Sequence, residues 1–330
     1  RWGGAFALLD AAPDADVVVF VHHGLDGLSG LRTILAALPF RHPVTVELWR
    51  IPRAGIPEDR DERRRWLFDL WTRMDAWVDS AVQARLYPPI VAGRSVFRVA
   101  CWNIHHGAPG SKWLANHVSL TSGIAQLDAD VVVLCEVDLR VWRSWFRDQA
   151  QLLGQRLGYH VLFAPARRLS PGWYGNALLS RTPPCRTEVL ALPARRGVET
   201  RSAVLTSIPV AGASVTVVGT HLQNAGSDGR GHADALAQLG VVNDAMKSRP
   251  SPAVLTGDLN LLASDVEPAF EQAGLSAVPT GPTFPFPSPR RRIDWMGVRG
   301  LEVVSSGTVP VYGSDHLAIS ADLKPSDDLG

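Results

Sequence analysis

Short apolar runs that end in polar side chains dominate the sequence from Val96 onward, and they constrain the fold most. Runs such as "VFRVACWNI", "DVVVLCEV", "SVTVVGTHL" and "AVLTGDLN" have the length and composition of buried β-strands. Amphipathic stretches near residues 113–127, 141–157, 232–248 and 265–273 lie between them. Many short strands with a few longer helices predict an α/β protein whose sheets are covered by helices.

The first 92 residues show a different pattern, with few predicted strands and one long predicted helix. Residues 16–21 ("DVVVFV") and 43–52 ("PVTVELWRIP") indicate strands, and "SGLRTILAALP" between them indicates a helix. A long amphipathic helix is predicted from Asp61 to about Tyr87, with acidic residues in its first turn, where the helix dipole favours them. The segment "YPPIVAGRS" then indicates a linker. We therefore expect a small α/β segment over residues 1–92 and a larger domain over residues 93–326.

Composition excludes several classes of protein. With 46% hydrophobic and 20% charged residues and a net charge of +1 over 330 residues, the chain is globular and not a polycation. The three cysteines lack CxxC spacing, which argues against a disulfide framework or a zinc site of that type. No stretch approaches ~18 apolar residues, so no membrane-spanning helix is predicted. Because the sequence begins with Arg1 rather than Met, we expect residues to be missing upstream; a cytoplasmic or membrane-peripheral location is favoured over secretion.

The apolar runs end, or are interrupted, at side chains that can bind a metal ion or a phosphate. Taken singly, each is better explained as a turn former, a helix cap or a structural histidine. Taken together, they offer oxygen ligands for Mg²⁺ or Mn²⁺ and two histidines for proton transfer, which is the inventory of metal-assisted phosphate-ester hydrolysis. The positions are Asn103, Glu136, His221, Asp258, Asn260, Asp294, Asp315 and His316.

The same positions lie in short motifs whose order resembles the endonuclease/exonuclease/phosphatase superfamily, which includes deoxyribonuclease I. From about Val96 to Leu323 the motifs read "WNI", "LCEVD", "YGNALLSR", "GTHL", "GDLN", "RIDW" and "SDH". The resemblance implies a four-layer α/β sandwich, in which two packed mixed β-sheets are flanked by helices. It also implies a phosphoesterase that depends on Mg²⁺ or Mn²⁺ and attacks the ester with water.

The resemblance implies roles for individual residues. Glu136 would be the central metal ligand, and Asn103 would lie close to it and to the phosphate as a further metal-site residue. Asp315 would complete the metal shell or form a second metal position. His316 would face the substrate and pair with Asp294, which would fix its tautomer. Whether His316 takes a proton from water or steadies the phosphate stays open at this point.

Further roles follow from the remaining motifs. Asp258 and Asn260 would orient the attacking water and bind a phosphate oxygen. His221 would stabilise the leaving oxygen, and its presence argues against an abasic-site enzyme of this superfamily. Positions that often approach substrate phosphate in the family are matched by Tyr174, Asn176 and Arg201.

The adjacent histidines His105 and His106 invite a metal assignment. If they continue the preceding strand, their side chains point to opposite faces, so at most one faces the site. We expect such a histidine to contact substrate rather than a metal.

Residues 1–90 resemble, less specifically, the C-terminal tail of a lysophosphatidate acyltransferase-type protein. The intervals in "HHGLD" do not fit the catalytic histidine–aspartate spacing of those enzymes, so only the tail would be present. Tryptophans on the predicted helix suit either an interfacial membrane helix or packing against a neighbouring domain. These are Trp66, Trp71 and Trp77.

Function therefore narrows to a phosphoesterase acting on nucleic acid, on a phospholipid or on a phosphorylated small molecule. Two alternatives stay open, which are a non-catalytic binding module that keeps the fold and an accessory part of a phospholipid acyltransferase. The sequence does not decide among the substrates.

Overall fold

The computed structural model describes residues 3–23, 45–86, 96–108, 115–226 and 229–326. The helix expected at "SGLRTILAALP" and the linker expected at "YPPIVAGRS" lie outside these ranges. The chain divides into two compact units, Arg1–Ile90 and Val91–Gly330. Among the described residues, every helix is too short or too polar to span a bilayer.

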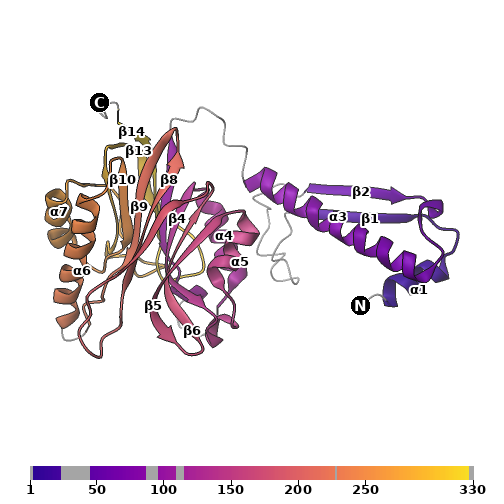
Figure 1. Cartoon of the computed structure of the whole chain (residues 1–330), viewed down its shortest axis with the longest axis horizontal. Helices are drawn as coiled ribbons and strands as arrows, with labels where there is room; N and C mark the ends of the chain where they lie inside the picture. The colour runs from indigo at the N-terminus through magenta and orange to yellow at the C-terminus, as the bar shows by residue number, and fades with distance from the viewer. Residues whose placement is uncertain (1–2, 24–44, 87–95, 109–114, 227–228, 327–330) are drawn as a thin grey trace. The chain divides into compact units, whose positions relative to one another are not determined.

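The N-terminal unit packs one long helix on a two-stranded sheet (Figure 1). Strands β1 (Val17–His23) and β2 (Thr45–Ile51) pair antiparallel, and α1 (Gly3–Ala11) and the 3₁₀ turn η1 (Arg53–Gly55) flank them. The long helix α3 (Arg60–Leu86) agrees with the predicted helix. The Asp59 side chain accepts from the backbone N–H groups of Asp61 and Glu62 at 3.0 and 2.9 Å and caps its first turn.

The core of this unit explains part of the tryptophan stripe. Leu67 and Leu70 of α3 pack on β1, and Trp66 and Trp77 contact the same cluster. Trp71 instead is 51% exposed. The apolar side of α3 is therefore used at least partly inside its own unit, an arrangement that the sequence did not suggest.

The larger unit contains two mixed six-stranded sheets. The first sheet has the order β11 (Ser276–Ala277), β12 (Asp294–Arg299), β10 (Ala253–Asp258), β9 (Ala213–His221), β8 (Ser202–Val210) and β7 (Cys185–Ala191). The second has the order β13 (Leu301–Val309), β14 (Ala318–Pro325), β3 (Phe97–Asn103), β4 (Val131–Leu139), β6 (Gly172–Ser180) and β5 (His160–Leu169).

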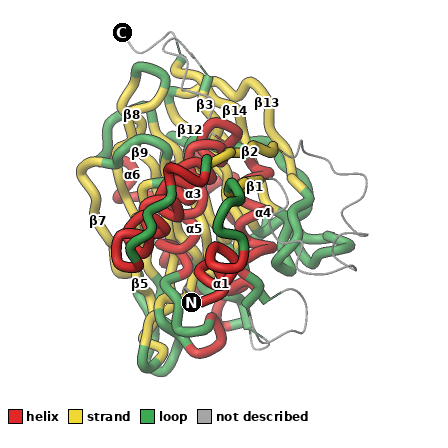
Figure 2. The backbone as a smooth tube through the Cα atoms, turned by 90° about the vertical axis from the view of Figure 1, so that its right-hand side faces the viewer, coloured by secondary structure: helices red, strands yellow, loops and turns green. Residues whose placement is uncertain are grey.

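The sheets pack face to face, and helices cover the outer faces (Figure 1 and Figure 2). The shared core joins Val99 and Val133 of one sheet to Val204, Val217 and Val254 of the other. Outside the first sheet lie α6 (Arg230–Lys247) and α7 (Ala263–Gln272), and outside the second lie α4 (His117–Leu127) and α5 (Gln149–Leu157). The predicted four-layer sandwich is confirmed.

Sequence patterns missed three strands, β7, β11 and β13. Strand β11 has only two residues, β7 exposes most of its side chains, and β13 buries only one residue. Strands β7, β11 and β13 lie at sheet edges, where one side of the backbone ladder is unpaired. Without a buried face they lack the apolar pattern by which a strand is recognised.

One glycine permits close approach of the sheets beneath the site. A Cβ on Gly219 of β9 would lie 2.7 Å from Cγ1 of Val133 of β4 in the opposite sheet. A larger residue would separate the sheets two positions before His221. The close packing at Gly219 thus leaves no room for a side chain between the sheets there.

Candidate active site

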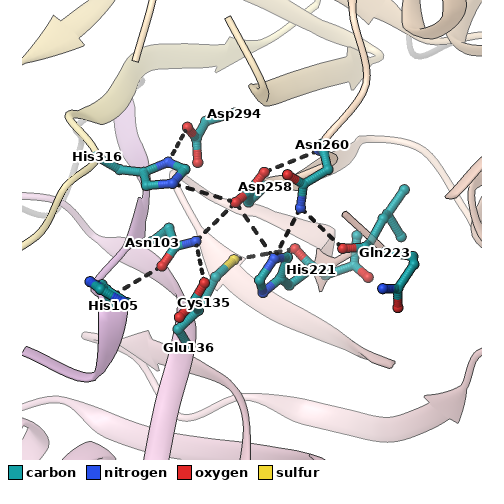
Figure 3. A network of polar contacts seen from close by, with 12 residues as sticks. Asn103, His105, Cys135, Glu136, His221, Gln223, Asp258, Asn260, Asp294 and His316 are labelled. Carbon is teal, nitrogen blue, oxygen red and sulfur yellow. Dashed lines mark hydrogen bonds and ion pairs between the residues drawn. The ribbon is translucent and has the colours of Figure 1, made fainter. Parts of the chain in front are cut away.

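The topology brings the predicted residues together at one end of the sandwich, where the central strands of both sheets end. Strands β3 and β4 run parallel in one sheet, and β9 and β10 run parallel in the other, so their carboxyl ends meet there. Strand β12 runs antiparallel to β10 and begins with Asp294 opposite Asp258. Strand β14 begins at Ala318, so Asp315 and His316 lie in the preceding loop. Figure 3 shows the resulting network.

Asn103, at the end of β3, links carboxylates from the two sheets. Its Nδ2 donates to Oε1 of Glu136 at 3.1 Å and to Oδ2 of Asp258 at 2.9 Å. Its Oδ1 accepts from the backbone N–H of His105 at 3.0 Å, which fixes the orientation of the amide. Asn103 lies beside Glu136, as predicted, but it turns its nitrogen toward the carboxylates. In this arrangement Asn103 is a donor that positions the two carboxylates, and its role as a metal ligand stays a prediction.

Glu136 reaches the site because β4 is interrupted. The pairing of β4 with β6 shifts register between Leu134 and Val137, and Glu136 has a positive φ of 62°. Such a bulge frees one residue from the alternation of side chains along the strand. The half-buried carboxylate of Glu136 consequently points to Asn103 rather than into the apolar layer.

His316 pairs with Asp294, which confirms the predicted hydrogen bond. Nδ1 of His316 lies 2.8 Å from Oδ2 of Asp294, a carboxylate that is fully buried. Burial alone would lower the pKa of His316, but the charge and hydrogen bond of Asp294, with Asp258 and Asp315, outweigh it and raise the pKa to about 10. The ring is therefore held as an imidazolium at neutral pH.

The loop that carries His316 is fixed by its neighbours. The Trp102 indole N–H donates to the backbone carbonyl of His316 at 3.1 Å. The Ser314 hydroxyl accepts from the His316 N–H at 3.1 Å and donates to the Asn103 carbonyl at 2.6 Å. The Phe284 ring lies 4.8 Å from the imidazole, centroid to centroid. His316 is thus oriented from three sides.

Asp258 lies between the two histidines at the end of β10. Its Oδ2 lies 3.5 Å from Nε2 of His221 and 3.8 Å from Nε2 of His316. Burial, and then the negative charge of Asp294, raise the pKa of Asp258 to about 7. The backbone N–H of Asn260 donates to its Oδ1 at 3.1 Å.

His221 is a buried neutral imidazole. Burial, and then the Arg201 cation, hold its pKa well below the ordinary value. Arg201 donates to Nδ1 of His221 at 3.0 Å, so the proton of the neutral ring is assigned to Nε2. This Nε2 lies 3.5 Å from Oδ2 of Asp258 and 3.2 Å from Nδ2 of Asn260. His221 can therefore donate a proton in a hydrogen bond but does not carry a positive charge.

The predicted substrate contacts lie beside this network. Arg201 is buried, pairs with Glu199 at 3.2 Å, and its charge and hydrogen bond act on the Tyr174 hydroxyl. Asn176 donates to the backbone carbonyl of Ser202 at 2.8 Å and so joins β6 to β8 across the sandwich. The side chain of Asn176 thus holds the two sheets together, and the side chain of Arg201 fixes the ring of His221 through a hydrogen bond.

A buried salt bridge behind Glu136 was not singled out from the sequence. Asp138 is fully buried and binds Arg143 through two hydrogen bonds of 2.9 and 2.8 Å. Gln149 donates to the carbonyl of His106 at 2.9 Å and accepts from the N–H of Asp138 at 2.8 Å. The sequence signal for this pair was Asp138, the second acid of "LCEVD", which follows an apolar run. A carboxylate buried in such a run is almost always paired, so a cationic partner could have been sought.

His105 and His106 do not continue β3. The strand ends at Asn103, and the histidines lie in the 3₁₀ turn η2 (His105–Gly107) with φ values of 42° and 44°. The argument from strand alternation was therefore wrong, because both rings lie on the Glu136 side. One ligand atom from each ring and one from Glu136 lie within 4.8 Å of one another. Burial, and then the charges of Arg143 and His105, lower the pKa of His106 to about 3.

The residues present fit a divalent cation. Around Asn103 and Asp258 the site gathers four carboxylates, and burial, followed by the charges of Asp294 and Glu136, raises the pKa of Asp258. Asp294, Asp258 and His316 form a second group whose ligand atoms lie within 4.8 Å of one another. Carboxylate oxygens with excess negative charge are what Mg²⁺ and Mn²⁺ bind. The carboxylates are Glu136, Asp258, Asp294 and Asp315.

Solved structures share the fold of the larger unit. An endonuclease/exonuclease/phosphatase from Beutenbergia cavernae is 26% identical, with a TM-score of 0.60 over 71% of this chain and 72% of that chain. TDP2 from D. rerio, in complex with a single-strand DNA product, is 18% identical, with a TM-score of 0.56 over 70% and 99%. The human Nocturnin catalytic domain with bound sulfate is 21% identical, with a TM-score of 0.55 over 70% and 94%.

Sequence comparison gives the same assignment. No curated protein matches the chain. The model of the Endonuclease/Exonuclease/phosphatase family matches residues 100–316, which is more than half of the chain and includes every predicted site residue. The chain belongs to the endonuclease/exonuclease/phosphatase family.

Proposed function

We propose that this protein hydrolyses a phosphate ester with water, with the help of Mg²⁺ or Mn²⁺. The observation that carries the proposal is the network around Asn103, in which carboxylates and imidazoles from both sheets converge. Glu136 and Asp315 would hold the ion. Bound there, it would polarise a phosphoryl oxygen and offset the negative charge of the ester.

The geometry favours a division of labour between Asp258 and His316. His316 has its Nδ1 bound to Asp294, which leaves Nε2 to donate to a phosphate oxygen. Its proton is retained by the surrounding carboxylates, so His316 is better suited to stabilise charge than to accept a proton from water. Asp258 faces the same space and would accept the proton of the attacking water, with Asn260 holding its other oxygen.

His221 would act on the leaving group. Its Nε2–H faces the site, and Arg201 holds Nδ1 from behind. A neutral donor can stabilise a developing alkoxide without adding a full charge to a crowded site. Arg201 would then serve as a positioning residue for His221 and, with Tyr174, would limit the space for the substrate.

The test is a hydrolysis screen of the full chain with Mg²⁺ or with EDTA. Substrates are plasmid DNA, single-stranded DNA, RNA, phospholipid vesicles, inositol phosphates and a bis-aryl phosphodiester. We expect activity that requires Mg²⁺ or Mn²⁺ and falls at least ~10²-fold in Glu136→Gln. Glu271→Gln, at an exposed position of α7, is the matched control. Hydrolysis that survives EDTA and Glu136→Gln would refute the proposal, and activity toward no ester would favour a binding module.

The N-terminal unit supports a separate proposal of peripheral membrane association. Its sheet exposes Val18, Val46 and Leu48 by 61%, 47% and 63% on the face that alternates with the one packed against α3. Apolar side chains on one surface favour an interface with lipid. We expect co-sedimentation with phosphatidylglycerol vesicles that weakens in Leu48→Gln. Equal binding of wild type and variant would refute membrane association through this surface. The resemblance to an acyltransferase tail would then give no reason to expect a lipid substrate.

A further inference from the structure

The turn after β3 holds two histidines in a costly backbone conformation. His105, His106 and Gly107 have consecutive positive φ values of 42°, 44° and 81°. For a residue with a Cβ, each such conformation costs roughly 1–2 kcal/mol. The turn is nevertheless closed by hydrogen bonds from Gly107 and Ala108 to the carbonyls of Ile104 and His105, at 2.7 and 2.9 Å. The fold therefore maintains both imidazoles in this place.

Both imidazoles have an unused ring nitrogen. Nδ1 of His105 and Nδ1 of His106 are buried without a hydrogen-bond partner among the described residues, and His106 is only 6% exposed. A buried polar atom without a partner costs about 1–3 kcal/mol. The two rings contact each other edge to face, with centroids 4.6 Å apart. With no partner in the described part of the chain, these two nitrogens are available to bind a metal ion.

Carboxylates complete the set. A ligand atom of Glu136 and one from each ring lie within 4.8 Å of one another. Oδ1 of Asp315 lies 3.6 Å from Nδ1 of His105, beyond a hydrogen bond but close to the same space. Atoms bound to one ion at ~2.1 Å are separated by roughly 3–4 Å, so small rotations of the side chains would close the set.

We propose that His105 and His106 bind, with Glu136, a divalent ion that accepts imidazole, such as Zn²⁺ or Co²⁺, in preference to Mg²⁺. The inference rests on the proposed function because Glu136 is common to both ligand sets. Mg²⁺ strongly prefers oxygen, whereas imidazole nitrogen suits the later first-row metals. The histidine pair would thus decide which ion the carboxylates of this site retain.

Metal binding itself tests the proposal. The full chain, stripped with EDTA and dialysed, is titrated with Zn²⁺ and Mg²⁺ by calorimetry and with Co²⁺ by visible absorption. We compare the wild type with His105→Gln and His106→Gln, and with His160→Gln, an exposed histidine of β5, as the matched control. Each site variant should weaken Zn²⁺ and Co²⁺ binding at least ~10-fold and change the Co²⁺ spectrum, while Mg²⁺ binding shifts less than ~2-fold. His160→Gln should behave as wild type.

Two results would overturn the proposal. One is unchanged Zn²⁺ and Co²⁺ affinity in both variants, and the other is an equal loss of Mg²⁺ affinity, which would make the histidines supports of an oxygen site. Thermal unfolding in EDTA checks that the variants fold. If His106→Gln does not fold, the result for His105→Gln, at the more exposed position, decides the test. Failure of hydrolysis with this metal selectivity intact would refute only the proposed function. Working Mg²⁺-dependent hydrolysis without the selectivity would refute only the present inference.

Discussion

Replacing Asp258 with asparagine should stabilise the metal-free protein while it abolishes hydrolysis. Asp258 is 2% exposed and lies near the carboxylates of Asp294 and Glu136. Burial, and then the charge of Asp294, raise its pKa from 3.8 to about 7. In the unfolded chain it ionises near 3.8, so between these two pH values the native state binds a proton that the unfolded state has lost. Stability therefore falls as pH rises from about 4 to about 7 and stays reduced above.

The size of the effect follows from the same shift. At ~1.4 kcal/mol per pH unit, a rise from 3.8 to about 7 corresponds to at most about 4 kcal/mol of lost stability at pH 8. The asparagine has no charge to lose, and its Oδ1 can still accept from Asn103 or Asn260. The free energy of unfolding of Asp258→Asn should therefore nearly equal that of the wild type at pH 4 and exceed it by a few kcal/mol above pH 7.

Urea unfolding at a series of pH values in EDTA measures this difference. Asp244→Asn, at a side chain that is 75% exposed, is the control and should show no such trend. Adding Mg²⁺ should restore wild-type stability at pH 8, because a nearby cation favours the ionised carboxylate. A stability difference that does not change between pH 4.5 and pH 8, or a variant less stable than wild type at pH 8, would refute the reasoning.

Three further predictions concern other parts of the site and its support. Asp294→Asn should lower kcat by ~10²–10⁴-fold with little change in KM, because it removes the partner that keeps His316 protonated. Steady-state kinetics measure kcat and KM separately, and an equal change in both constants would contradict the prediction. Arg143→Met should destabilise the protein by roughly 3–5 kcal/mol by leaving Asp138 buried and unpaired, and adding Asp138→Asn should recover part of the loss in chemical unfolding. Gly219→Val should cost about 1–3 kcal/mol or more in the same assay, because its side chain would meet Val133 of the other sheet.

The central strands of the sandwich could be predicted because both of their faces are buried. Strands β3, β4 and β10 read as continuous apolar runs, and their polar ends mark the edge where the site lies. The edge strands β7 and β13 could not be found, since strands with at most one buried residue leave no apolar periodicity. Burial is thus the property that the sequence pattern reports.

Orientation within the site could not be predicted in the same way. The residues that gather there, including the Asp294–His316 pair, were predicted from the resemblance of their motifs to the family. The direction of the Asn103 amide depends on one backbone N–H, that of His105, which the sequence does not reveal. The positions of His105, His106 and Glu136 depend on positive φ values and on a bulge, which interrupt the alternation used to predict them.

The division of the site between two sheets has a consequence for how activity appears during refolding. Asn103 and Glu136 belong to one sheet and His221 and Asp258 to the other, and Trp102 reaches across 214 positions of the chain to the carbonyl of His316. Contacts so distant in sequence form late, because closing such long loops costs entropy before any contact repays it. Hydrolysis should therefore appear only when both sheets have docked, so the recovery of activity would time the last step of assembly.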